Sequence, residues 1–181
     1  MRYLPCALVA VLTLVSFTLP AAESITTTYY RVGGATAGEV RADILRKGRK
    51  GWDGYTDWYL SWQFRWNHSG GHCAISSVTA NLRATVILPQ LDRRPDRALE
   101  NRWTSYLRAL TRHEQDHVEI ARRGAREVES AIRALAPAPS CGSLESSANA
   151  AGHAVVARVR RAQDQFDRDT EHGRTQGVIF P

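Results

Sequence analysis

The chain has 181 residues, which is enough for one domain once a targeting segment is removed. It carries 24 Lys and Arg residues against 18 Asp and Glu, a formal net charge of +6. The arginines are scattered along predicted helices and are not grouped with aromatic side chains, so composition excludes nucleic acid as an expected partner and leaves an acidic envelope surface open.

The first residues are typical of a signal peptide. Arg2 supplies a positive charge, residues 4–19 form an apolar run, and residues 20–22 are small enough for a cleavage site. The run is short for a membrane span and no basic stop-transfer cluster follows it. We therefore expect residues 1–22 to be removed on export, which leaves a secreted or periplasmic domain of residues 23–181 without a stable membrane span.

Two cysteines remain after this segment, Cys73 and Cys141. In an oxidising compartment such a pair predicts a disulfide, which would stabilise the fold by about 4 kcal/mol on the chain-entropy model. A pair of metal-binding cysteines is less favoured because the spacing is not C-x-x-C.

The first half of the mature chain predicts a sheet. Residues 25–32 are rich in β-branched and aromatic side chains, whereas residues 37–47 have a helical pattern and follow a capping box. Strict alternation predicts strands over residues 58–66 and 78–88, joined as an antiparallel hairpin, and Pro89 is expected to end the second strand.

Two long helices are predicted next, over residues 95–135 and 143–169. The first has one apolar stripe that His113 and His117 interrupt. The expected fold class is α+β, a small, mostly antiparallel sheet followed by two long helices, similar to a reduced zincin. The histidine-bearing helix is the best candidate to cover the aromatic face of the sheet.

Residues 113–117 of this helix read H-E-x-x-H. Side chains four residues apart project from one helical face, so His113 and His117 can bind one zinc ion from a rigid element. Glu114 lies beside that position, where a carboxylate can accept a proton from a water molecule. The alternative is an ordinary amphipathic helix whose two imidazoles hydrogen-bond to their neighbours.

A catalytic zinc site needs a third protein ligand. The metzincin pattern is excluded because residues 120 and 123 are Ile120 and Arg123, and no carboxylate stands about 20 residues downstream, as a gluzincin requires. The candidates are Glu145, His153 and His172, the last of which follows the final helix and precedes a glycine.

The chain resembles an exported bacterial family of unknown function whose members are regarded as predicted secreted zinc-dependent proteases. The resemblance covers nearly all of the mature chain and is carried by Tyr29-Tyr30 with Val32 and Gly33, the Trp-rich strand, Cys73, Leu88-Pro89, residues 103–117, Cys141, and a closing D-x-x-T-x-H-G at residues 167–173. One departure is Phe166, where the family pattern has tyrosine.

This resemblance implies that His113 and His117 are zinc ligands, that Glu114 is the general base, and that His172 is the third ligand. Asp167 or Asp169 would then accept a hydrogen bond from an imidazole N–H. Candidates for stabilising an oxyanion are Tyr55, His72 and Arg174.

The favoured function is hydrolysis of a peptide bond in a peptide or protein substrate, with a cell-envelope protein as one expected substrate. Two alternatives stay open. One is a non-catalytic exported binding or envelope domain that keeps the motif with or without zinc, and the other is a zinc amidase acting on cell-wall peptides. The sequence leaves the oligomeric state open.

Overall fold

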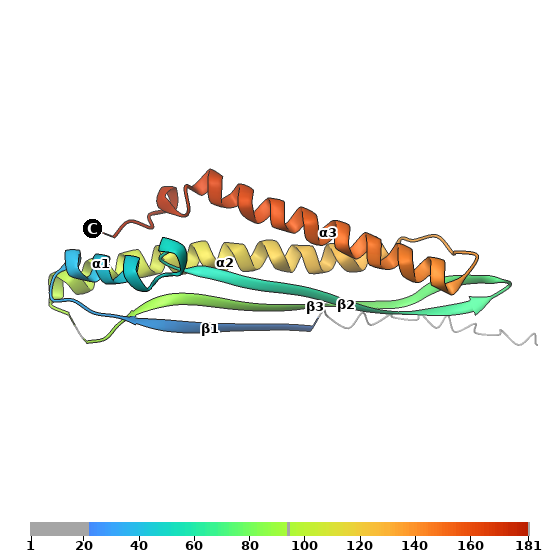
Figure 1. Cartoon of the computed structure of the whole chain (residues 1–181), viewed down its shortest axis with the longest axis horizontal. Helices are drawn as coiled ribbons and strands as arrows, with labels where there is room; N and C mark the ends of the chain where they lie inside the picture. The colour runs from blue at the N-terminus through green and yellow to red at the C-terminus, as the bar shows by residue number, and fades with distance from the viewer. Residues whose placement is uncertain (1–21, 94, 181) are drawn as a thin grey trace, which may run out of the picture.

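A computed structural model describes residues 22–93 and 95–180, so residues 1–21 of the predicted signal peptide lie outside the described residues. The described elements, in chain order (Figure 1), are β1 (Ala22–Val32), α1 (Ala37–Lys47), a 3-10 turn (Arg49–Gly51), β2 (Tyr55–Ser69), β3 (His72–Leu91), α2 (Arg97–Arg133), α3 (Cys141–Thr170) and a second 3-10 turn (Arg174–Gln176). Within the described part of the chain, no helix has the length and apolar character needed to cross a membrane.

The sheet has three strands in the order β1-β3-β2. β2 and β3 are antiparallel and form the predicted hairpin, and β1 runs parallel to β3. Trp58, Leu60 and Trp62 pair with Ala84, Leu82 and Ala80, so the apolar residues of both strands lie on one face, as the alternation predicted. The expected α+β class, a mostly antiparallel sheet followed by two long helices, is confirmed.

The hairpin is longer than predicted. Pairing extends to Ser69 and His72, so the turn shrinks to Gly70 and Gly71, whose positive φ angles of 59° and 78° suit a tight hairpin turn. The expectation that Pro89 ends its strand was wrong, because β3 continues to Leu91. Pro89 is tolerated because the pairing of β3 with β2 ends at Ile87, and beyond that point β1 is its partner.

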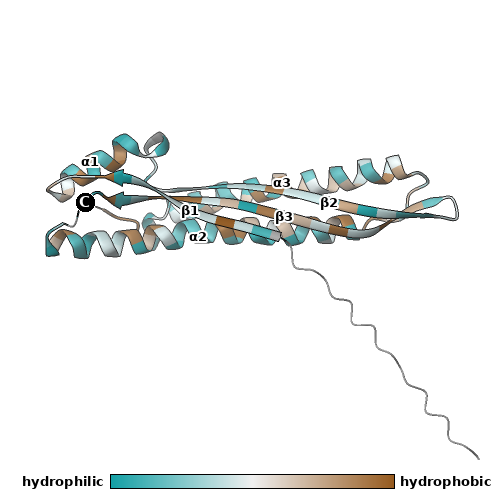
Figure 2. Cartoon of the chain, turned by 90° about the horizontal axis from the view of Figure 1, so that it is seen from below, coloured by the Kyte–Doolittle hydropathy of each residue, from teal (hydrophilic) through white to brown (hydrophobic). Residues whose placement is uncertain are grey.

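Both long helices lie on the same face of the sheet (Figures 1 and 2). α2 buries its apolar stripe against the sheet, and the buried residues include Leu99, Trp103, Tyr106, Leu110, Val118, Ile120, Ala121, Ala125, Val128 and Ile132. α3 packs on α2, and the two backbones approach closely at Gly124, where an added Cβ would lie 2.3 Å from Cγ2 of Val159. We predicted that the histidine-bearing helix, α2, would cover the aromatic face of the sheet. α3 also contributes to that cover, because the Trp62 indole donates a hydrogen bond to Asn149 of α3.

The predicted disulfide is present between Cys73 and Cys141. It joins the start of β3 to the start of α3, and the backbone of Cys73 also pairs with Ala138. We call this end of the molecule, with the hairpin turn and the α2–α3 connection, the hairpin end.

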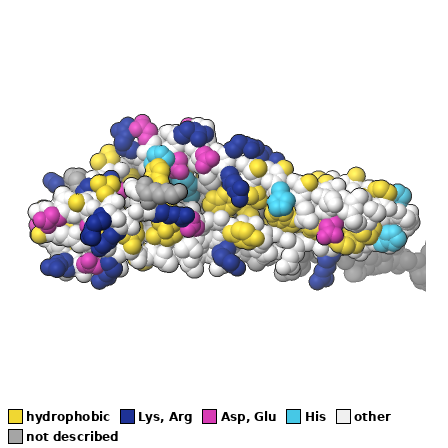
Figure 3. Space-filling view, in the orientation of Figure 1, with side chains coloured by type: hydrophobic (Ala, Val, Ile, Leu, Met, Phe, Trp, Pro, Cys, Tyr) yellow, Lys and Arg dark blue, Asp and Glu magenta, His cyan; other side chains and the backbone are white. Residues whose placement is uncertain are grey.

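The opposite end carries α1 and the C-terminal tail, and we call it the site end (Figure 1). The capping box at α1 is present, with Thr36 accepting from the Glu39 backbone N–H. On the face shown in Figure 3, charged side chains gather toward this end and become sparse toward the hairpin.

Candidate metal centre

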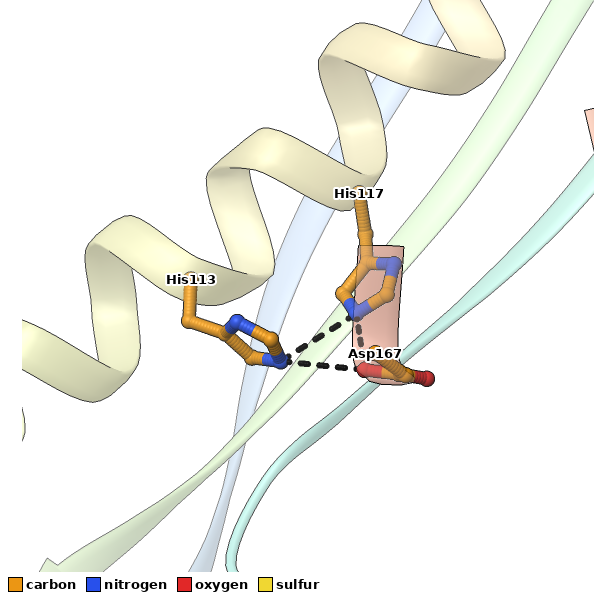
Figure 4. Close-up of side chains that lie close together, drawn as sticks. All are labelled: His113, His117 and Asp167. Carbon is orange, nitrogen blue, oxygen red and sulfur yellow. Dashed lines mark hydrogen bonds and ion pairs between the residues drawn. The ribbon is translucent and has the colours of Figure 1, made fainter. Parts of the chain in front are cut away.

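Three ligand-type side chains converge where α2 and α3 meet at the site end (Figure 4). His113 and His117 come from successive turns of α2, and Asp167 comes from the last turn of α3. The His113 and His117 Nε2 atoms are 3.3 Å apart, and they lie 3.3 Å and 3.0 Å from Oδ1 of Asp167. Among the described residues, these three form the group of His, Cys, Asp and Glu side chains suited to hold a metal ion.

The spacing of these three atoms fits zinc. With ligands about 2.0–2.1 Å from the ion, the corners of a tetrahedron are roughly 3.3–3.4 Å apart. The three measured separations fall at or slightly below that edge length. Three protein ligands would fill one face of the tetrahedron and leave the fourth corner open.

Two glutamine side chains determine the tautomer of each imidazole, that is, which ring nitrogen carries the hydrogen. Nδ1 of His113 donates to Oε1 of Gln176 at 2.8 Å, and Nδ1 of His117 donates to Oε1 of Gln163 at 2.5 Å. Each amide is oriented by its own NH₂ group, because Gln176 donates to Asp116 and Gln163 donates to the carbonyl of His117. Since an amide oxygen only accepts, both neutral imidazoles present a bare Nε2 lone pair to Asp167.

Two Nε2 lone pairs and a carboxylate oxygen facing one another repel unless positive charge lies between them. A metal ion supplies that charge, and so do extra protons on the imidazoles. Burial lowers the pKa of His117, but the hydrogen bonds that the protonated ring makes to Asp167 and Gln163 outweigh burial and raise the pKa above its ordinary value. Burial raises the pKa of Asp167, but its bonds to the two imidazoles lower it well below its usual range.

Glu114 is 2% exposed and lies beside this group. Thr56 of β2 donates its hydroxyl to Oε2 of Glu114 at 2.8 Å, so one carboxylate oxygen is held. The other oxygen, Oε1, lies next to Gly54, where an added Cβ would be 3.3 Å away. Burial raises the pKa of Glu114 above its ordinary value, against the opposing effect of the Thr56 hydrogen bond and the two imidazoles.

Phe166 forms an apolar wall of the site. Its ring stacks on His113, with centroids 5.1 Å apart, and meets His117 edge to face at 5.0 Å. The side chain at position 166, where the resemblance led us to expect tyrosine, therefore lies against both imidazoles and contributes packing without a hydroxyl group.

The D-x-x-T-x-H-G segment is a turn that joins α3 to the tail. Thr170 accepts from the backbone N–H of Gly173, and Glu171 and His172 both have left-handed φ angles of 49° and 55°. Gly173 follows with a φ of 83°, and an added Cβ would lie 2.6 Å from Val178 and 3.0 Å from the His113 ring. A side chain at residue 173 would be strained by the positive φ and would also meet Val178 and the His113 ring, so this position favours glycine.

His172 lies at the rim of the site. Its Nδ1 is 3.6 Å from Oδ1 of Asp167, its ring packs on Trp52 with centroids 4.0 Å apart, and its side chain is 46% exposed. Asp167, which was expected as a hydrogen-bond acceptor, is grouped with His113 and His117 as a side chain that could hold a metal ion, and His172 is not part of that group.

The other sequence candidates lie elsewhere. His153 is exposed on α3 and contacts Trp62, and Glu145 is exposed near the start of α3. His72 lies at the hairpin turn, where its Nδ1 is 3.0 Å from the Gly70 carbonyl. None of the three belongs to the His113, His117 and Asp167 group.

A cleft of about 420 Å³ opens over the site. Glu114 and the three ligand-type side chains line its floor, while Tyr55, His172 and Arg174 line its sides. Of the three expected oxyanion-stabilising candidates, Tyr55 and Arg174 thus face the cleft and His72 does not.

The family membership follows from a comparison with known families. The model of a family described as bacterial protein of unknown function (DUF922) matches residues 27–173, a range that includes the H-E-x-x-H helix and ends at Gly173. The chain belongs to this family. No curated protein and no solved structure matches it.

Proposed function

We propose that this DUF922 family member is a zinc-dependent peptidase, with His113, His117 and Asp167 as the zinc ligands and Glu114 as the general base. The observation that carries the proposal is the triangle of two Nε2 atoms and one carboxylate oxygen, with edges of 3.0–3.3 Å, at the floor of an open cleft. When bound there, zinc supplies a Lewis acid that lowers the pKa of water and polarises a carbonyl group.

The protein's own groups account for proton transfer. Oε2 of Glu114 is occupied by the Thr56 hydroxyl, so Oε1 is the oxygen that accepts a proton from the attacking water. The same oxygen then passes the proton to the leaving nitrogen, and this returns the carboxylate to its starting state. Burial raises the pKa of Glu114, which makes its carboxylate a stronger base than an exposed one.

The remaining residues of the site orient the imidazoles or contact the substrate. Gln163 and Gln176 hold the imidazoles with Nε2 directed at the site, and Phe166 excludes water from one side. Arg174 and Tyr55 supply hydrogen-bond donors for a carbonyl oxygen that gains negative charge. His172, half exposed against Trp52, is placed to contact substrate at the rim.

The central experiment compares hydrolysis of casein and of a peptide library by the wild-type, Glu114→Gln and Glu119→Gln proteins. Glu119 is an exposed residue of the same helix, so it receives the same substitution without touching the site. We expect chelator-sensitive cleavage that falls by about 10²–10⁴-fold in Glu114→Gln and is retained in Glu119→Gln. Unimpaired cleavage by Glu114→Gln would remove that residue from the mechanism.

Metal analysis tests the ligands separately from activity. About one zinc ion per chain is expected, and His113→Ala, His117→Ala and Asp167→Ala should each lower that content. His172→Ala should keep it. The opposite result for Asp167 and His172 would restore His172 as the third ligand.

Purified peptidoglycan is a second substrate in the same assay. Cleavage of peptidoglycan without cleavage of casein would identify the zinc amidase alternative. Zinc binding without either activity would identify the non-catalytic exported domain.

A further inference from the structure

β2 is an edge strand of the described sheet. It pairs with β3 on one side, and no other strand pairs with its second side. Over residues 56–62 the backbone N–H and C=O groups on that side are therefore open to another strand. Seven residues of extended chain present about 20 Å of such edge.

A groove of about 590 Å³ runs along this edge. β2 residues 56–62 form one wall, and α3 forms the other with Asn149, His153, Val156 and Arg160. Figure 3 looks onto this side of the molecule, where apolar side chains gather below α3. The groove therefore offers backbone groups on one side and a partly apolar surface on the other.

The groove is continuous with the cleft over the candidate metal centre. Thr56 and Trp58 line both. Thr56 also donates to Glu114, so the end of the free edge lies against the proposed general base. A ligand seated along β2 would thus lead directly to the groups proposed for hydrolysis.

We propose that this groove binds the substrate as an extended peptide that adds to the free edge of β2. Trp58, Leu60 and Trp62 lie on the helix-facing side of β2, whereas Tyr59 lies on the opposite side and is 62% exposed. A peptide in the same plane directs every second side chain toward α3. The substrate class is therefore an unfolded or extended polypeptide segment of about six or seven residues, with apolar side chains at alternate positions.

This inference names the substrate class of the proposed peptidase, and cleavage of that substrate rests on the proposed function. Binding of the peptide, however, is measured without turnover. The probe is a capped ten-residue peptide of alternating Thr and Leu, titrated calorimetrically into the Glu114→Gln protein. Two further probes carry N-methyl groups on all Leu amides or on all Thr amides. In an extended strand, the amides of alternate residues point to opposite edges, so only one of these two sets can face β2.

We expect one N-methylated peptide to bind at least about tenfold more weakly than the parent peptide, since each blocked amide loses a backbone hydrogen bond, and the other to bind like the parent. Equal binding of both N-methylated peptides, strong or weak, would overturn pairing with β2. This comparison needs no substitution in the groove.

A substitution then locates the site on the protein. Val156→Arg places a long charged side chain in the groove and should weaken binding of the parent peptide by at least about tenfold. Ala157→Arg introduces the same side chain at the next, exposed position of α3, outside the groove, and should leave binding unchanged. Equal effects of the two substitutions would place the peptide elsewhere.

The two proposals fail separately. Cleavage of peptides by the wild-type protein, together with indifference to both N-methyl patterns, would retain the peptidase and remove the groove. Asymmetric binding of the N-methylated peptides without cleavage by the wild-type protein would retain the groove and remove the hydrolytic function.

Discussion

α2 and α3 meet at both ends of the molecule, and they do so by different means. At the hairpin end the contact is apolar, with Val128, Ile132, Leu144 and Ala148 buried, and the Cys73–Cys141 disulfide lies close by. At the site end the same helices meet through buried or half-buried polar groups, namely His113, Glu114, His117, Gln163 and Asp167.

The difference shows where stability and function are placed. Burying polar side chains is costly unless each one has a hydrogen-bond partner. In the described part of the chain, no buried side-chain nitrogen or oxygen atom is left without a partner. The hairpin end supplies a covalent link and an apolar core, and this allows the site end to hold a group of polar side chains whose arrangement serves a ligand.

The largest effect expected is on the hairpin end. Replacing both Cys73 and Cys141 by serine should lower the free energy of unfolding by about 4 kcal/mol, because the link closes a long loop in the unfolded chain. Chemical denaturation measures this change, and zinc affinity of the folded variant should match that of the wild type. Loss of zinc binding in the folded variant would show that the two ends are coupled.

A smaller effect is expected from the glutamines at the site end. Gln163→Ala and Gln176→Ala each release one imidazole, so zinc affinity should fall by about 10–100-fold, measured by competition with a chelator. Gln165→Ala is the matched control, because Gln165 is exposed on the same helix and bonds to Asp169. Equal zinc affinity in all three variants would contradict a role for Gln163 and Gln176 in holding the ligands.

Gly173→Ala tests the turn beneath His113. The substitution should destabilise the protein by roughly 1–2 kcal/mol, because residue 173 has a left-handed φ and an added methyl group meets Val178 and His113. Gly142→Ala, in the first turn of α3 with no atom near the added Cβ, should leave stability unchanged or slightly higher. Thermal unfolding of the two variants gives the comparison, and similar melting temperatures would count against strain at residue 173.

The smallest expected effect is on the pH dependence of the unfolding free energy, and it involves Asp43 of α1. Hydrogen bonds from Lys47 and from the backbone of Gly33 lower the pKa of Asp43 from 3.8 to about 2. A carboxylate with a lowered pKa stabilises the folded state above its unfolded pKa, and that contribution disappears as pH falls from about 4 through 2. The unfolding free energy of the wild type should therefore decline more steeply than that of Asp43→Asn over this interval, and parallel acid-unfolding curves would argue against it.

Local signals in the sequence were sufficient for most of the fold. The capping box at Thr36 and Glu39, the alternation at residues 58–66, and the stripe along α2 each depend on spacing within one element, so each was predicted. Strand ends were harder to predict, and Pro89 shows why. Whether a proline ends a strand depends on which neighbouring strand still pairs at that position.

The grouping of side chains at the candidate site could be predicted in part. His113, Glu114 and His117 lie within one helical turn, and helical geometry alone brings them together. Gln163 lies one turn before Asp167 on α3, and this i, i+4 spacing is a signal that could have been noticed once Asp167 was considered a ligand. Gln176 offers no such signal, because it reaches His113 only after the left-handed turn at residues 171–173 reverses the chain.

The sequence by itself determined the α+β class, the disulfide pair, and a helix that presents two imidazoles and a carboxylate together, because all of these follow from local periodicity or from residue type. Only the tertiary structure showed which side chain joins His113 and His117 in the candidate metal centre. Asp167 and His172 are five residues apart, yet Asp167 is held in the last turn of α3 facing α2, whereas His172 is carried to the rim by a left-handed backbone. The packing of α3 on α2, which is close at Gly124, brings Asp167 to the two imidazoles, and no pattern within a single segment encodes that contact.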